Sequence, residues 1–265
     1  MKGKTRLLTA LLGAALTGTA LGQTISYLNA TYTQGYWLIA NPLDAGDGKN
    51  TVGHVFGHND AGYPSPVLPD GAVIYKFNGG AFVVNQFSID RWDDPTMSLV
   101  PGEGAFLRIP PGQTAKVTFV GEVLQGRLVI PIPQGFSLLS SKVPQEAVLT
   151  RDVNMPADTR ELGFPAVDGD TIYRWRHNAG TYSIHSWMID QWDVPPVIDA
   201  EESFFVRKVA AVDWVREFVV KGRLEGIQPR PAQAGGDSTS RGDRRLIGLV
   251  LSQQPLVNPR VLRSD

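Results

Sequence analysis

The chain has 265 residues, of which 25 are Lys or Arg and 26 are Asp or Glu, and it contains no Cys. The formal net charge of −1 lacks the basic excess typical of nucleic-acid-binding proteins, so we expect no nucleic-acid partner. Without Cys, disulfides and thiol catalysis are excluded, while 28 Gly and 19 Pro favour short strands joined by turns.

The first 22 residues have the pattern of a secretory signal peptide. Basic residues near the N-terminus precede the apolar run Leu7–Leu16, and Ala20-Leu21-Gly22 fits a small-x-small cleavage site. The run is too short for a membrane span, although an uncleaved N-terminal anchor remains the alternative. We therefore expect an exported protein (periplasmic, cell-surface or extracellular) that starts near Gln23 and has no membrane span after cleavage.

A long internal repeat organises the rest of the chain, at an offset of 98 to 100 residues. The corresponding segments are Gln34–Ala40 with Gln134–Ser140, Asp70–Phe77 with Asp168–Trp175, and Gly80–Asp93 with Gly180–Asp193. A repeat of this length indicates two copies of one small domain. We place a signal peptide at 1–22, the first β repeat at 23–124, the second at 125–226, and a flexible C-terminal tail at 227–265.

Hydrophobic residues alternate with a period of two inside each copy, which is typical of half-buried strands. Val73, Tyr75 and Phe77 point to one side of such a strand, and Ile74 and Lys76 to the other. The alternation predicts an all-β protein of two tandem small β-barrel or sandwich domains with short helices in their long loops. The strands expected are Tyr36–Ala40, Ala81–Phe87, Ala105–Ile109 and Ala115–Val120, with Phe136–Ser140, Thr181–Trp187, Phe204–Lys208 and Arg216–Val220 as their counterparts.

Turns and helices are expected at four places between the strands. Asn78-Gly79-Gly80 and His177–Gly180 read as hairpin turns, because Asn and Gly tolerate positive φ. A short helix is expected at Asn50–Phe56, with Asp158–Gly163 as its counterpart in the second copy. In the tail, the apolar run Leu246–Leu251 could add a strand to a neighbour or have no role.

Metal-ligating residues are few, and we predict neither a metal nor a cofactor. His54 and His58 would share one helix face and Asp60 follows them, but Val55 stands where an HExxH zinc motif needs Glu. The loop Asp44–Asn50 has oxygen ligands without the spacing of an EF-hand. Both groups are interpreted as ordinary loop residues.

The twinned Asp-x-Trp-Asp motif is the best candidate for ligand binding, at Trp92, Asp93, Trp192 and Asp193. A Trp ring flanked by carboxylates can stack on a sugar and bond its hydroxyls. The alternative is structural: Trp covers the end of a β domain while Asp bonds loop backbone. Retention of the motif in both copies favours the structural interpretation.

Carboxylates for glycoside hydrolysis can be chosen from Asp90, Asp93 and Glu103, and Glu103 recurs as Glu202. Such pairs depend on a three-dimensional separation that the sequence does not give. No nucleophile elbow and no phosphate-binding Gly pattern occurs. A secreted hydrolase is therefore the least favoured function.

Both copies resemble β-rich units of exported, mostly uncharacterised bacterial proteins. The resemblance rests on Gly35–Leu38 and Gly135–Leu138, on Asp-Gly-x-x-Ile-Tyr, and on Gly102–Phe106, where the second copy instead has Ala200–Phe204. It implies a fold and export, and it carries over no catalytic residue and no substrate. We predict a non-enzymatic structural or interaction protein of a bacterial envelope or extracellular matrix, with a protein or glycan partner. A carbohydrate-binding module pair is the alternative.

Overall fold

The structure is a computed structural model that describes residues 25–220. The expected signal peptide, the tail and its Leu246–Leu251 run lie outside the described residues. Within residues 25–220, no helix combines the length and apolar character needed to cross a membrane.

The prediction of an all-β fold is confirmed. In the first half the elements are β1 (Ile25–Ile39), α1 (Val52–Phe56), β2 (Val73–Asn78), β3 (Ala81–Ser88), β4 (Arg91–Trp92) and β5 (Ala105–Glu122). In the second half they are β6 (Gly126–Ile132), β7 (Gly135–Ser140), β8 (Ala147–Val148), β9 (Thr171–Arg176), the 3₁₀ turn η1 (His177–Ala179), β10 (Thr181–Met188), β11 (Gln191–Trp192), β12 (Val197–Ile198), β13 (Ser203–Lys208) and β14 (Val212–Phe218).

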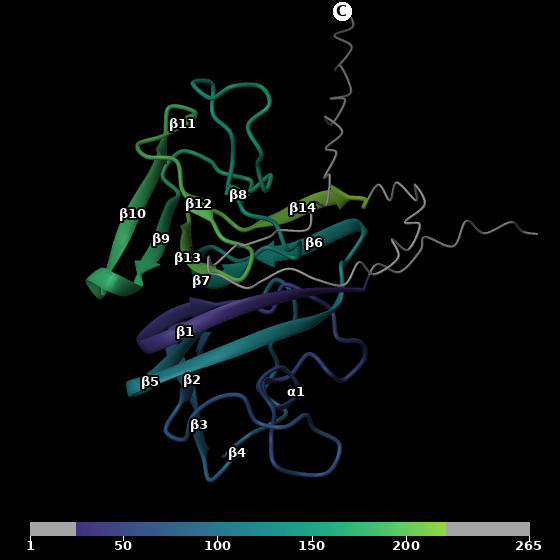
Figure 1. The fold of residues 1–265 in the computed structure, drawn as a ribbon. Coiled ribbons are helices and arrows are strands. Elements are labelled where there is room, and N and C mark those ends of the chain that lie inside the picture. Colours follow the sequence, from purple (N-terminus) through teal and green to yellow (C-terminus); the bar gives the residue numbers. More distant parts are fainter. Residues whose placement is uncertain (1–24, 221–265) are drawn as a thin grey trace, which may run out of the picture.

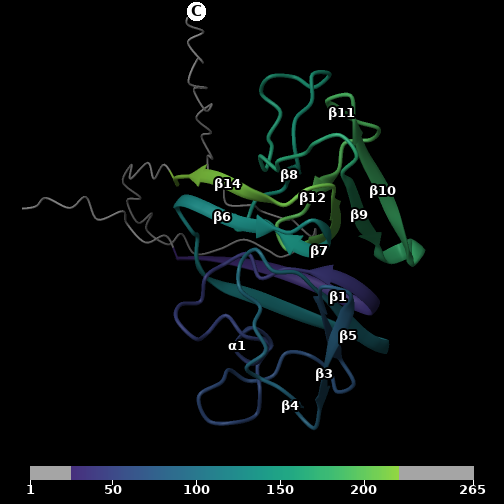
Figure 2. The same cartoon turned by 180° about the vertical axis from the view of Figure 1, so that it is seen from behind.

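Each half contains one five-stranded antiparallel sheet, and the two sheets have matching strand orders. The first order is β1-β5-β2-β3-β4 and the second, read in the same direction, is β7-β13-β9-β10-β11. Equivalent residues occupy equivalent registers, since Gly35 pairs with Ile109 and Gly135 with Lys208. In the first half one long β1–β5 ladder runs the whole length, whereas in the second half β6–β14 forms a separate ladder. Figures 1 and 2 show the halves stacked, with β1 and β5 beside β6 and β7.

The alternation predicted from the sequence separates a core inside each half from a layer between the halves. Ile74 lies in the core of the first half and Ile172 in that of the second, both with no exposed surface. The residues that follow them, Tyr75 and Tyr173, pack against a third cluster made from both halves. The period of two therefore reflects sheets that are covered on both faces, which is a sandwich arrangement.

Contacts between the halves are reciprocal. Ile39 forms an isolated β-bridge with Glu202, and its counterpart Leu139 forms one with Glu103. Beside these bridges, the Ala40 N–H donates to the carbonyl of Glu201 at 2.8 Å, and the equivalent Ser140 N–H donates at 3.1 Å to the residue before Glu103. Such exchange is the pattern of an isologous interface, here formed within one chain.

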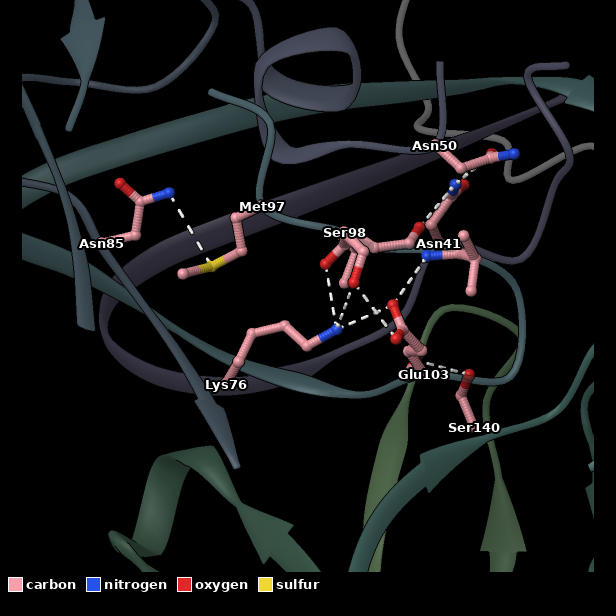
Figure 3. Close-up of polar contacts among 10 residues, drawn as sticks. Asn41, Asn50, Lys76, Asn85, Met97, Ser98, Glu103 and Ser140 are labelled. Carbon is pink, nitrogen blue, oxygen red and sulfur yellow. Dashed lines mark hydrogen bonds and ion pairs between the residues drawn. The ribbon is translucent and has the colours of Figure 1, made fainter. Parts of the chain in front are cut away.

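Glu103 is the polar centre of this contact on the side of the first half (Figure 3). Its carboxylate lies 2.7 Å from Lys76 Nζ and accepts a hydrogen bond of 3.2 Å from Ser98 Oγ. Its carbonyl accepts a hydrogen bond of 2.8 Å from Ser140 Oγ of the second half. Glu202 repeats the arrangement with a bidentate pair to Arg174 at 2.7 and 2.6 Å. One Glu in each half therefore ties the sheet to the opposite half.

Glu201 is expected to make the stability depend on pH. Burial, together with the nearby charges of Asp199 and Glu202, raises the pKa of the Glu201 carboxyl. The folded state then binds this proton more tightly than the unfolded chain, so the carboxylate lowers stability once the pH exceeds its unfolded pKa of about 4.3. We expect Glu201→Gln to be more stable than the parent at pH 7, with the difference vanishing towards pH 4.

Urea unfolding of both proteins at several pH values measures this difference. The Gln side chain leaves the Glu201 carbonyl, and its bond from Ala40, in place. A difference in unfolding free energy that stays constant with pH would contradict the assignment.

The long loops agree only in part with the sequence. The expected helix at Asn50–Phe56 is present as α1, and Thr51 caps it by accepting from the His54 N–H at 3.4 Å. The expected counterpart at Asp158–Gly163 is wrong, since no helix forms there. Glu161 instead forms an isolated β-bridge with Val148, and Gly163 has a φ of +65°. The backbone is therefore extended at Glu161 and turns at Gly163.

Candidate binding groove

The two motif tryptophans lie inside the cores. Trp92 is 3% and Trp192 4% exposed. Each indole Nε1–H donates to a loop carbonyl at 3.1 Å, from Trp92 to Gly57 and from Trp192 to Thr150. The Trp92 ring packs against a neighbouring Phe and the Trp192 ring against a second Trp, both with centroids 5.0 Å apart. Neither ring has a face open to a sugar, so the predicted stacking role is replaced by a structural one.

The motif aspartates close the hairpins that carry these tryptophans. Asp93 accepts from the Gln86 N–H at 3.3 Å, and Asp193 accepts from the Ser186 N–H at 2.9 Å. At the hairpin tips, Asp90 and Asp190 have φ values of +59° and +58°. The preceding residues Ile89 and Ile189 have φ values of +51° and +54°. Positive φ at both central positions of each turn is the geometry of a tight two-residue hairpin turn. Trp92, Asp93, Trp192 and Asp193 therefore maintain two equivalent hairpins.

The histidines and acidic loops form separate local contacts. His58 Nδ1 accepts from the Trp92 N–H at 3.0 Å, so its Nε2 carries the proton that points to Asp60 at 2.9 Å. His54 bonds to Thr51 at 3.0 Å instead. In the loop from 44 to 50, the Asp44 carboxylate accepts from Gly46 and Asn50 of the same loop. Residues 25–220 contain no group of three His, Cys, Asp or Glu side chains placed to hold a metal ion.

A groove lined only by aromatic side chains lies between the two halves. It has a cavity volume of about 360 Å³, and six residues line it: Tyr36, Tyr75, Phe82, Phe106, Trp175 and Tyr182. The first four come from β1, β2, β3 and β5, and the last two from β9 and β10. Figure 1 shows the hairpins β2–β3 and β9–β10 on the same side of the molecule. We call these six residues the aromatic groove.

Edge-to-face and tilted contacts connect the rings of the aromatic groove. Phe106 at its floor is 9% exposed and lies 5.8 Å from Trp175 and 6.1 Å from Phe82. On the rim, Tyr36 is 43% and Phe82 45% exposed. Offset and perpendicular ring contacts at these separations are favourable, and they fix the rings as a rigid wall.

One wall of the groove is fixed by contacts across the halves. Trp175 Nε1–H donates to the Tyr36 carbonyl at 2.7 Å. His177 Nδ1 lies 3.1 Å from the same carbonyl, so Nδ1 carries the proton, and Nε2 lies 3.1 Å from Thr33 Oγ1. The His177 ring also stacks on Trp37 with centroids 3.7 Å apart. The Trp175 donor is thus engaged internally, and only its ring is available to a ligand.

The chemistry of the groove suits binding. Burial raises the pKa of Tyr182, and burial together with neighbouring Tyr36 raises the pKa of Tyr75. These hydroxyls therefore stay protonated at neutral pH and can donate hydrogen bonds. The lining contains no carboxylate, imidazole or amine, so it offers ring faces and Tyr hydroxyls.

Glu103 and Asp93, two of the carboxylates considered for hydrolysis, have structural partners elsewhere. Glu103 is paired with Lys76, and Asp93 bonds hairpin backbone. Neither lines the aromatic groove. A catalytic reading of these residues receives no geometric support from their positions.

Comparisons with protein-family models, with curated proteins and with solved structures found no match to this chain. The groove must therefore be interpreted from its own geometry. Its residues are Tyr, Phe and Trp on six different strands. From the sequence alone they could equally be core residues. Each groove residue has an aromatic counterpart in the other copy, such as Tyr173 for Tyr75. The buried pair Trp92 and Trp192 shares this property, so it does not identify the groove from the sequence.

Proposed function

We propose that this chain is an exported, non-enzymatic interaction protein of a bacterial envelope or extracellular matrix, and that the aromatic groove is its binding surface. The observation that supports the proposal is a concave surface made of six aromatic residues, with no charged residue among them. Apolar surface left open to water is unfavourable unless a partner covers it, and contiguous exposed patches commonly mark binding sites.

The groove has the dimensions and composition of a ligand site. Binding pockets typically have volumes of about 300–1,000 Å³ and are lined by apolar and aromatic side chains with few polar groups. Here Tyr hydroxyls supply the polar groups, and Tyr36 and Phe82 supply exposed rings. The ligand class that fits is a partner presenting apolar or aromatic groups, with a small number of hydrogen-bond acceptors.

Carbohydrate binding remains the second candidate, at a different place from Trp92 and Trp192. Sugars present apolar C–H faces that stack on aromatic rings, and their hydroxyls accept hydrogen bonds from groups such as Tyr. Tyr36, Trp175 and Tyr182 offer this combination in the groove. A glycan array and a peptide library, each probed with the full chain, separate a glycan partner from a protein partner.

Truncation of one groove residue should weaken binding to whichever ligand the two libraries identify. We expect Tyr36→Ala to reduce affinity by at least about tenfold, because central aromatic contacts dominate binding energies. Phe136→Ala is the matched control: Phe136 is the counterpart of Tyr36, is 48% exposed against 43% for Tyr36, and lies outside the groove lining. Affinities are measured by titration calorimetry, with folding checked by circular dichroism.

Two results would contradict the proposal. The first is that neither library yields a ligand. The second is that Phe136→Ala weakens binding as much as Tyr36→Ala, since an effect shared by both faces cannot come from the groove.

A further inference from the structure

The outer edge of β3 pairs with no strand of the part of the chain that the structure describes. β3 pairs with β2 along its length, from Ala81 to Gln86, and with β4 only at Phe87 and Ser88. A two-residue turn joins β2 to β3, and Asn78 and Ala81 form its closing pair. In such a hairpin the closing pair is hydrogen bonded, and every second residue directs its backbone groups away from the partner strand.

The residues of β3 whose backbone N–H and C=O groups point away from β2 are therefore Phe82, Val84 and Gln86. Contacts with the nearby residue Asp93 support this register. The Gln86 carbonyl accepts from the Asp93 N–H at 3.0 Å, and the Gln86 N–H donates to the Asp93 carboxylate at 3.3 Å. Phe82 and Val84 have no such backbone partner within residues 25–220. Their N–H and C=O groups form an open edge of a sheet.

This edge carries no charged side chain, no Pro and no bulge, three features that protect strand edges in natural proteins. Soluble proteins usually block an open edge with Lys, Pro, a bulge or a covering loop. The segment Ala81-Phe82-Val83-Val84-Asn85 contains neither a charged residue nor Pro, and its pairing with β2 is regular. Phe82, Val83 and Val84 are 45%, 49% and 56% exposed, so both faces of the edge are apolar. An edge of this kind is complementary to another strand.

We propose that β3 pairs with β3 of a second copy of this chain, antiparallel, about a two-fold axis that passes beside Val83. In that register Phe82 lies opposite Val84 of the second copy, and Val84 lies opposite Phe82 of the second copy. Both members of each pair point their backbone groups outward, as a hydrogen-bonded antiparallel pair requires. Four backbone hydrogen bonds form, and all the outward groups of Phe82 and Val84 are satisfied.

The side chains of the edge also favour pairing with itself. On the groove side, each Phe82 lies beside a Val84, and an aromatic residue next to a β-branched one is a favourable cross-strand pair. On the other face, Val83 lies beside Val83 of the second copy. Because the segment carries no charge, antiparallel pairing places no like charges opposite each other. The two-fold arrangement is closed, so it gives a dimer and not a filament.

The equivalent edge of β10 fits this role less well and provides a matched control. The backbone groups of Tyr182 and Ile184 point away from β9. The register is the same as in β3, because the Ser186 backbone bonds to Asp193 as the Gln86 backbone bonds to Asp93. Ser183 replaces Val83, however, which makes one face of that edge polar. Ile184 and Val84 are each 56% exposed, so substitutions at the two positions change the same amount of surface.

Proline substitution tests the pairing directly. Val84→Pro removes an outward N–H while leaving the bonds between β2 and β3 intact. We expect the parent chain to sediment as a dimer at micromolar concentration, Val84→Pro to raise the dimer dissociation constant at least about 100-fold, and Ile184→Pro to leave it unchanged. Analytical ultracentrifugation over a concentration series measures the constants, and circular dichroism confirms that each variant is folded.

A second variant keeps the test decisive if Val84→Pro fails to fold. Val83→Lys would place two positive charges side by side at the two-fold axis, whereas Ser183→Lys alters only β10. We expect only Val83→Lys to give monomers, with faster amide exchange at Phe82 and Val84. A parent chain that is monomeric at all concentrations would overturn the proposal. So would a dimer that dissociates equally with the β10 variants, or a chain ending at Val220 that dimerises while the full chain does not, since the tail would then cover the edge.

Discussion

Replacing Lys208 by Ile should destabilise the protein by about 3 to 5 kcal/mol, the range for breaking a buried ion pair from one side. Lys208 Nζ is paired with the Asp170 carboxylate in the core of the second half, and the two side chains are 1% and 0% exposed. Nζ also donates to the Pro165 carbonyl at 2.7 Å. The substitution would leave the Asp170 charge buried without its cation, and burying an unpaired charge is strongly unfavourable.

The first half contains an apolar alternative to this ion pair. Ile109 and Ala72 occupy the positions of Lys208 and Asp170, and they are 1% and 0% exposed. We therefore expect the double variant Lys208→Ile, Asp170→Ala to recover most of the loss, to within about 2 kcal/mol of the parent, because an apolar pair of fitting shape can replace a buried ion pair. Urea unfolding of the parent, both single variants and the double variant gives the coupling free energy.

Additive effects of the two substitutions would show that the ion pair is not the cause. The Asp170→Ala single variant serves as the control for lost backbone contacts, because Asp170 also accepts from the Val167 N–H at 2.9 Å and the Val209 N–H at 3.1 Å. A loss in the double variant as large as in Asp170→Ala alone would assign the effect to these turn contacts.

Gly104→Ser should destabilise the contact between the halves by about 1 to 3 kcal/mol, the usual effect of overpacking. A Cβ atom at Gly104 would lie 2.6 Å from the Ser203 Cβ and 2.9 Å from the Leu138 Cγ. Such distances are shorter than any real contact, so the halves would have to move apart. Gly104 and Ser203 are counterparts in the two halves, and there is space for a side chain on one of them only.

Exchanging the two residues should restore part of the contact. In the double variant Gly104→Ser, Ser203→Gly the clash with Ser203 is removed, but the new Cβ still lies 2.9 Å from the Leu138 Cγ. We therefore expect a thermal stability between those of Gly104→Ser and the parent. Ser203→Gly alone should have a modest effect, because the buried Ser203 hydroxyl has no hydrogen-bond partner among the described residues. Differential scanning calorimetry of the four proteins measures this, and a double variant as unstable as Gly104→Ser would refute the steric explanation.

The sequence predicted the strands well because alternation along a strand is a local property. The hairpin at Asn78-Gly79-Gly80 formed as expected between β2 and β3, since its glycines adopt φ values of +61° and +140°. Two strands expected separately, Ala105–Ile109 and Ala115–Val120, are one strand in the structure, β5. Pro110 and Pro111 lie inside β5, and the long ladder with β1 accommodates this part of the strand with a bulge between Thr33 and Gly35.

The candidate site could not be predicted in the same way, because it depends on contacts between distant segments. Trp92 packs in the core and donates a hydrogen bond to Gly57, 35 residues away, whereas its sequence neighbours alone are equally consistent with an exposed ring. The wall of the aromatic groove depends on Trp175 bonding to Tyr36 across 139 residues. Alternation identifies Tyr75 as lying on one face of a strand, but only the packing of the halves shows that this face borders a groove.

The reciprocal contact between the halves has a consequence for how its two sides can vary. In an assembly of two identical subunits, position 104 would face another copy of itself, and only Gly would fit on both sides. Here both sides belong to one chain, so Ser203 can carry the side chain that Gly104 cannot. Covalent linkage also keeps the contact intact at any dilution. The same freedom allows Trp175 and its counterpart Phe77 to differ, and of these two residues only Trp175 lines the aromatic groove.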